Sequence, residues 1–162
     1  MKLNASIRRA EPRDVERIVD FNIRMADETE GKRLDAKTVR QGVSTVINDS
    51  SKGFYLVAED EGSSRVIGQL LVTFEWSDWR DKCFWWIQSV YVQPPLRRCG
   101  VFKRLYEFVD TLAAQRPDVC GIRLYVEQSN HTAKQTYANA SMRETGYRIY
   151  EKLFQVDSRG IL

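Results

Sequence analysis

The sequence predicts an α/β fold, in which a central mixed and mostly antiparallel sheet of about six or seven strands is flanked by about four helices. Short aromatic and β-branched segments of strand type are interleaved with segments whose apolar residues have helical spacing. In the first half of the chain, short turns join the strands as hairpins. In the second half, strands and helices alternate, which indicates crossover connections and therefore a mixed sheet.

The N-terminal part of the chain predicts one strand followed by two helices. Residues 6–9 form the strand, and the segment Pro12-Arg13-Asp14 opens the first helix. Asp35 is the expected N-cap of the second helix. Helical spacing is kept in the first helix by Val15, Ile18, Val19 and Asn22, and in the second by Val39, Val43, Val46 and Ile47.

The middle of the chain predicts three strands. Residues 54–58 and 66–74 form a hairpin across the Gly- and Ser-containing turn at 60–64. After a polar turn at 77–82, residues 83–92 are aromatic and β-branched, and Gln93-Pro94-Pro95 ends them abruptly. This segment is the best candidate for a central strand.

The second half predicts two crossover units. An amphipathic helix starts near Gly100 and stops before Pro117. Residues 122–126 form the next strand, residues 130–142 a short helix, and residues 147–154 a last strand that closes the sheet.

Composition limits the classes of function. A chain of 162 residues with 43% apolar and 29% charged residues fits one compact domain spanning residues 1–162. The net charge of +3 is too small for a nucleic-acid-binding surface but suits a small polyanionic ligand. Cys83, Cys99 and Cys120 lack zinc or disulfide spacing and are expected to be reduced thiols. No signal or membrane segment is recognisable, so we expect a cytoplasmic protein without membrane contact.

One strand–loop–helix corner has the features of a phosphate site. Residues 87–92 lead through the loop 93–100 into the helix that starts at Val101. Backbone N–H groups converge at such a helix N-terminus, the helix dipole adds positive potential, and Gly100 lets an anion approach closely. Arg97, Arg98, Lys103 and Arg104 surround the corner with positive charge. The loop fits neither the Walker A nor the G-x-G-x-x-G pattern, so ATP and NAD are poor candidates.

The corner resembles the R-x-x-G-x-G/A signature of the GNAT superfamily of acyl-CoA-dependent N-acyltransferases, with Arg97, Gly100 and Phe102 at its defined positions. A second family motif resembles Asn130-x-x-Ala133-x-x-x-Tyr137. Two residues depart from the family pattern, because Phe102 replaces a small residue and Ser141 replaces a glycine. The resemblance implies acetyl-CoA (coenzyme A) as cofactor. The implied cofactor-binding residues are Val90, Tyr91, Val92, Arg97, Arg98, Cys99, Gly100, Val101, Phe102, Lys103 and Asn130.

The resemblance also implies catalytic roles. Tyr137 would protonate the departing sulfur, and a backbone N–H near Val90 or Tyr91 would stabilise the carbonyl oxyanion. A basic amine must lose a proton before it attacks, and Glu75 is the candidate base, with Asp78 as the second choice.

Each of these site assignments has an alternative. Tyr137 could be a packing residue, and Glu75 an ordinary surface carboxylate. Glu28 and Glu30 lie in the segment that lines the acceptor pocket in this family, where they would attract a cationic amine. The alternative for this pair is a solvated acidic turn.

These observations predict an N-acetyltransferase that transfers the acetyl group of acetyl-CoA to a primary amine of a small molecule or peptide by direct attack. The alternative is a non-catalytic acyl-CoA-binding sensor with the same fold. Nucleic acid, membrane and metal ions are not expected as partners, whereas a homodimer is possible.

Overall fold

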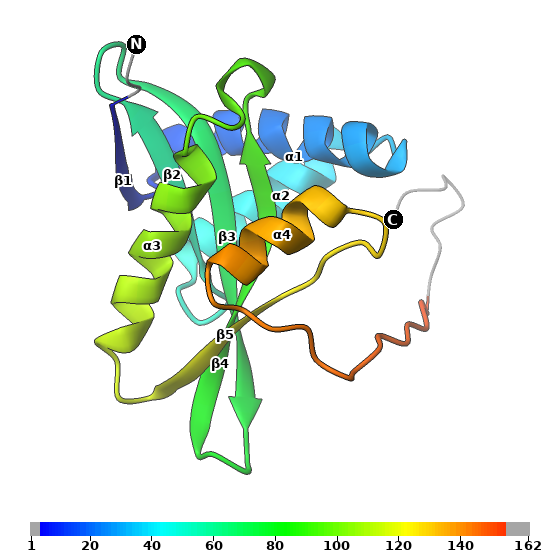
Figure 1. The fold of residues 1–162 in the computed structure, drawn as a ribbon. Coiled ribbons are helices and arrows are strands. Elements are labelled where there is room, and N and C mark those ends of the chain that lie inside the picture. Colours follow the sequence, from blue (N-terminus) through cyan, green and yellow to red (C-terminus); the bar gives the residue numbers. More distant parts are fainter. Residues whose placement is uncertain (1–3, 155–162) are drawn as a thin grey trace. The chain divides into compact units, whose positions relative to one another are not determined.

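The computed structural model describes residues 4–154, and they form two compact units that meet in the sequence between Arg123 and Leu124. Figure 1 shows the elements. The first unit contains β1 (Ala5–Arg9), the short 3-10 helix η1 (Pro12–Asp14), α1 (Val15–Glu30), α2 (Ala36–Asn48), β2 (Phe54–Asp60), β3 (Arg65–Ser77), β4 (Lys82–Val92), η2 (Pro94–Leu96) and α3 (Val101–Ala114). Strand β5 (Val119–Leu124) reaches the boundary, and α4 (His131–Asn139) lies in the second unit.

The sheet has the strand order β1-β2-β3-β4-β5. The pairs β1–β2, β2–β3 and β3–β4 are antiparallel. Strand β5 is the neighbour of β4, and at the start of both strands the Cys83 amide donates to the Asp118 carbonyl at 2.8 Å. The predicted α/β fold with a mostly antiparallel central sheet is confirmed.

The sheet has five strands within residues 4–154, slightly fewer than expected. The predicted strand at 147–154 is wrong, because these residues have no regular secondary structure. A strand needs a hydrogen-bonding neighbour and an apolar face to bury. Here Tyr150 and Phe154 are 93% and 88% exposed. The fifth strand begins at Val119 rather than at residue 122.

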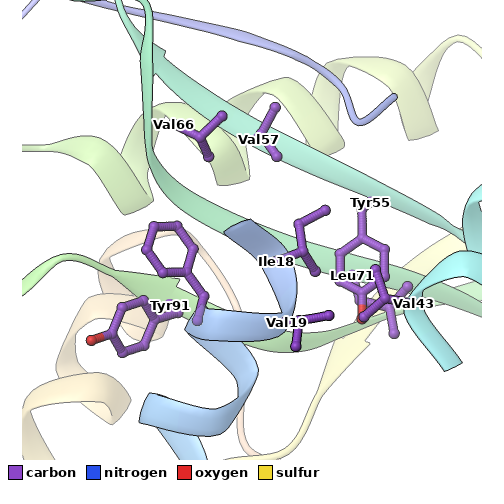
Figure 2. Packing of buried hydrophobic residues seen from close by; sticks show 9 residues of the cluster. Ile18, Val19, Val43, Tyr55, Val57, Val66, Leu71 and Tyr91 are labelled. Atoms are coloured by element: carbon purple, nitrogen blue, oxygen red, sulfur yellow. The ribbon is translucent and has the colours of Figure 1, made fainter. Parts of the chain in front are cut away.

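Helices α1 and α2 cover one face of the sheet, and α3 lies on the other (Figure 1). Figure 2 shows the core under α1 and α2, where Ile18, Val19, Phe21 and Val43 pack on Tyr55, Val57, Val66, Leu71 and Tyr91. On the other face, Leu105 and Val109 of α3 are fully buried. Burial of each such side chain contributes about 1.5–3 kcal/mol, so the two apolar layers hold the sheet that positions the site.

Gly68 allows α3 to approach β3 closely. A Cβ atom at this position would lie 3.1 Å from Val101 Cγ1 and 3.1 Å from the Tyr91 carbonyl oxygen. A Cβ atom at this position would require its neighbours to shift by a few tenths of an ångström. The N-terminus of α3 is therefore held close to the end of β4.

A charged cluster joins β1, η1 and β2. Asp14 is buried, and its carboxylate accepts hydrogen bonds from Arg8 at 2.7 and 3.0 Å and from the Glu11 amide at 2.7 Å. Glu59 pairs with the same Arg8 guanidinium at 2.6 Å. Burial alone would raise the pKa of Asp14, but the hydrogen bonds from Arg8 and Glu11 outweigh it and lower the pKa. Asp14 is therefore ionised at neutral pH.

Strand β4 contains a β-bulge. Gln69 of β3 is opposite Tyr91, and Leu71 is opposite Gln88, so β4 has one residue more than β3 between these pairs. Ser89, inside this interval, has a left-handed backbone with φ 49°. The bulge interrupts the regular ladder in the segment where the sequence places the thioester-binding backbone.

Candidate active site

The bulge brings an irregular piece of backbone to the α1/α2 side of the sheet. The extra residue of a bulge has no regular ladder partner, and bulges re-aim backbone and side chains next to active sites. Ser89 and Val90 occupy this position, opposite Leu70. Two residues of β4 thus oppose one residue of β3, and the regular ladder is interrupted at Ser89 and Val90.

The loop after β4 forms an open corner at the start of α3. Arg98 and Gly100 both have left-handed backbones, with φ 64° and φ 83°. Within the described part of the chain, no side chain caps α3 at Gly100, and a Cβ atom there would meet nothing within 4 Å. The Cys99 amide donates only a long hydrogen bond of 3.4 Å to the Leu96 carbonyl. The corner has the space and the positive helix end that a phosphate group needs.

The basic side chains around this corner have different partners. Arg97 turns back, donating from Nε to the Val92 carbonyl at 2.9 Å and forming an ion pair with Glu28. Arg104 donates to the Ala5 carbonyl at 2.9 Å, and Lys103 lies 3.7 Å from Glu107. Arg98 is exposed, and within residues 4–154 it makes no ion pair or hydrogen bond. Arg98 is thus the cation with the greatest freedom to meet an anion.

Glu28 joins α1 to the end of β4. Its carboxylate accepts a hydrogen bond from the Tyr91 hydroxyl at 2.8 Å and pairs with Arg97, whose guanidinium carbon lies 5.3 Å from the centroid of the Tyr91 ring. The hydrogen bonds from Arg97 and Tyr91 lower the pKa of Glu28. Burial, followed by the Glu28 carboxylate, raises the pKa of Tyr91. Glu30 does not join this group, because it pairs with Lys32.

Glu75 lies away from the bulge. Its carboxylate pairs with Arg123 at 2.6 Å and accepts a hydrogen bond from the indole Nε1 of Trp86. Glu75 is five residues along β3 from Leu70, or roughly 17 Å at the usual rise per strand residue. Asp78 accepts a hydrogen bond from the Trp79 amide in the turn after β3. The structure does not bring either carboxylate to the bulge.

An open pocket beside the bulge is lined by residues that the sequence analysis did not select. It has a volume of about 260 Å³ and is lined by Asn22, Met25, Leu34, Val39, Gly42, Val43, Tyr55 and Ser89. The fully buried Gln69 donates to Asn22 Oδ1 at 2.7 Å and to the Ser89 carbonyl at 3.4 Å. A glutamine within the apolar run of residues 66–72 was the sequence signal for this cluster.

The second unit contains the other family motif. The Asn130 side chain caps α4 by accepting a hydrogen bond from the Ala133 amide at 3.0 Å. Tyr137 is half-buried on this helix, and burial raises the pKa of its phenol, which is therefore protonated at neutral pH. Ser141 has a left-handed backbone with φ 62°, the conformation that the family's glycine adopts without strain.

Other kinds of site are not evident in the residues described. Within residues 4–154 there is no group of three or more His, Cys, Asp or Glu side chains arranged to hold a metal ion. Cys83, Cys99 and Cys120 are free thiols. None of the helices in this range is both long and apolar enough to cross a membrane.

Comparison with known proteins gives a consistent result. Residues 15–141 match the model of the acetyltransferase (GNAT) family. A solved structure of a possible acetyltransferase from Clostridium difficile 630 is 39% identical, with a TM-score of 0.86 over 94% of this chain and 99% of that one. Glucosamine-6-phosphate N-acetyltransferase from Arabidopsis thaliana is 17% identical, with a TM-score of 0.71 over 94% of this chain and 99% of that one, and shares the fold. No curated protein matches the sequence.

Proposed function

Because the chain belongs to the acetyltransferase (GNAT) family, we propose that it is an N-acetyltransferase that uses acetyl-CoA and a primary amine. The observation that carries the proposal is the succession of a bulge at Ser89–Val90 and an open, uncapped helix N-terminus at Gly100. The bulge suits a thioester carbonyl, and the helix N-terminus suits a diphosphate.

The residues of the corner fit the coenzyme. The start of α3 offers backbone N–H groups and a helix dipole to phosphate oxygens, and the space at Gly100 admits them. Arg98 supplies a charge-assisted hydrogen bond. Arg97 acts differently, because its pairing with Glu28 and the Val92 carbonyl fixes the end of β4.

The chemistry follows from the polarity of these groups. Bound acetyl-CoA supplies an activated acetyl group as a thioester. The nitrogen of the neutral amine would attack the carbonyl carbon directly and the C–S bond would break, with the amine's proton passing to solvent, while the Val90 amide would stabilise the negative charge on the carbonyl oxygen. Tyr137 is the proposed acid that protonates the leaving sulfur, and burial, which raises the pKa of its phenol, keeps it in the protonated form until that step.

Replacement of Tyr137 by phenylalanine tests this proposal. We expect Tyr137→Phe to lower kcat roughly 100-fold or more, because general acid catalysis contributes at least that factor. The affinity for acetyl-CoA, measured by calorimetry, should stay the same. The control is Tyr150→Phe, which removes a hydroxyl from a side chain that is 93% exposed and should leave both values unchanged.

The starting point is a thermal-shift titration with acetyl-CoA and a CoA-release assay across chemically diverse amines. Binding together with CoA release supports the transferase. Binding of acetyl-CoA without CoA release in the presence of any amine would favour the sensor. Absence of binding would exclude both the transferase and the sensor.

A further inference from the structure

Gln69 is a fully buried glutamine in the apolar middle of β3. Its Nε2 atom donates to Asn22 Oδ1 at 2.7 Å and to the Ser89 carbonyl oxygen at 3.4 Å. The side chain thus connects helix α1 to the bulge of β4. Its Oε1 atom is buried without a partner among the residues that the structure describes, which costs free energy, so the glutamine does not serve stability alone.

The hydrogen-bond acceptors fix the orientation of the Gln69 amide. The Ser89 carbonyl can only accept, so Gln69 must present Nε2 to it rather than Oε1. Asn22 presents Oδ1 to Gln69, and its Nδ2 donates to the Tyr55 hydroxyl at 3.2 Å. Tyr55 is also hydrogen-bonded to the Ser89 side chain. These four residues form a closed polar cluster that holds Ser89 at its carbonyl and at its side chain.

Ser89 needs this support because of its backbone. It has a left-handed conformation with φ 49°, which is unfavourable for a residue with a Cβ atom and persists only where the surroundings hold it. The bulge also interrupts the ladder that would fix a peptide unit in a regular strand. The polar cluster replaces the constraint that the ladder does not give.

The Ser89 carbonyl and the Val90 N–H belong to the same peptide unit. The described chain has no cis peptide bond, and in a trans unit the C=O and N–H groups point in opposite directions. The bond from Gln69 to the carbonyl therefore turns the Val90 N–H away from the polar cluster. A flipped peptide would place that N–H against the Nε2 donor and leave both donors buried without acceptors. Gln69 thus disfavours the flipped peptide.

We infer that Gln69 is a positioning residue for the transfer reaction, which aims the Val90 N–H at the thioester oxygen by holding the Ser89 carbonyl. The inference rests on the proposed function, in which this N–H stabilises the oxyanion. Gln69 is fully buried, so it acts through the peptide unit rather than by touching a substrate. Its hydrogen bond also polarises that unit and strengthens the N–H as a donor. A donor fixed in advance needs no rearrangement when charge develops on the oxygen.

Infrared spectroscopy of bound acetyl-CoA tests the aim of the N–H group. Acetyl-CoA with an isotope label at the thioester carbonyl is bound to the protein without an amine, so no transfer occurs. A hydrogen bond to the carbonyl oxygen lowers its stretching frequency, and we expect this downshift in the wild type. Gln69→Met should lose most of it, because methionine has a similar volume but no donor.

Steady-state kinetics give a second readout. We expect Gln69→Met to lower kcat at least about tenfold and to leave the KM for acetyl-CoA within about threefold, because a misaligned oxyanion donor acts mainly in the transition state. A purely structural role would instead lower the melting temperature, while the infrared band and the kcat of the folded protein stayed unchanged.

Gln88→Met is the matched control. Gln88 lies on β4 directly before the bulge, and its side-chain amide donates to the Thr73 hydroxyl rather than to a backbone carbonyl. Its removal should leave the infrared band at the wild-type position. If Gln69→Met does not fold, Asn22→Leu keeps the test, because it removes the acceptor that orients the Gln69 amide and should lose part of the downshift.

Three results would overturn the positioning role and leave the N-acetyltransferase proposal intact. They are an unchanged infrared band in the folded Gln69 or Asn22 variant, an unchanged kcat in the folded Gln69→Met variant, and an equal loss of the downshift in Gln88→Met. If the band of acetyl-CoA bound to the wild type matches that of free acetyl-CoA, the Val90 N–H does not bind the carbonyl. That result would refute the inference together with the oxyanion part of the proposed function.

Discussion

Two adjacent arginines show how differently neighbouring side chains contribute to the candidate site. Arg97 is held by Glu28 and the Val92 carbonyl, whereas Arg98 is exposed and has a left-handed backbone. The sequence predicts a basic corner but cannot separate these roles. Glu28, the acidic partner that holds Arg97, lies 69 residues away in the chain, on helix α1.

Arg98→Ala should therefore raise the KM for acetyl-CoA about tenfold, because one charge-assisted hydrogen bond to phosphate is lost. The turnover number should change little, since the residue lies away from the reacting atoms. Steady-state kinetics give both values. Arg104→Ala is the control, because its guanidinium binds the Ala5 carbonyl, and it should not alter this KM.

Glu75→Gln decides between the two interpretations of this carboxylate. Since Glu75 is paired with Arg123 and lies five residues along β3 from the bulge, we expect kcat/KM to stay within about threefold of the wild-type value. The partly exposed ion pair contributes at most about 1 kcal/mol to folding, measurable by urea denaturation. A decrease in kcat of roughly 100-fold, with a changed pH profile, would restore Glu75 as the base.

At the scale of elements, the charged cluster of Arg8, Asp14 and Glu59 ties the first strand to its neighbours. Asp14→Asn should destabilise the fold by about 2 kcal/mol at pH 7, because it leaves the half-buried Arg8 with one charged partner fewer. The pKa of Asp14 is lowered on folding, so its contribution is complete above the ordinary pKa of 3.8 and is lost as the pH falls through the folded value.

Urea denaturation at pH 7 and near pH 2 measures this dependence. The difference between wild type and Asp14→Asn should shrink at low pH. Asp27→Asn, at an exposed carboxylate, should show almost no difference at either pH. A constant Asp14→Asn effect at both pH values would show that packing, rather than charge, causes it.

Most elements could be predicted because local signals fix them. Asp35 caps α2 as expected, accepting from the Thr38 amide at 2.9 Å, and Pro94 and Pro95 end β4. The strand expected at 147–154 was wrong because its apolar residues also occur in exposed coil, and only a neighbouring strand could have decided the matter. The bulge in β4 was not predicted, since the extra residue is visible only against the register of β3.

At the scale of the whole molecule, the family signature locates the corner, but the polar cluster beside the bulge depends on contacts between distant segments. Asn22, Tyr55, Gln69 and Ser89 come from α1, β2, β3 and β4, and no short motif contains them. Asn130 and Tyr137 belong to the second compact unit, and the cofactor-binding role of Asn130 and the catalytic role of Tyr137 stay predictions, as does the single domain over residues 1–162.

The inserted residue in β4 also reverses which side chains point to each layer. Val72 is opposite Ile87 and Leu71 opposite Gln88, but beyond the insertion the odd-numbered Tyr91 shares a face with Gln69 and the even-numbered Val92 shares the other with Gly68. In β4, the odd-numbered side chains therefore point to one face of the sheet before the inserted residue and to the other face after it. Deleting residue 89 or 90 would restore simple alternation and would leave Tyr91 opposite Gln69 and Val92 opposite Gly68, so such a variant would lose only the irregular backbone between Gln88 and Tyr91.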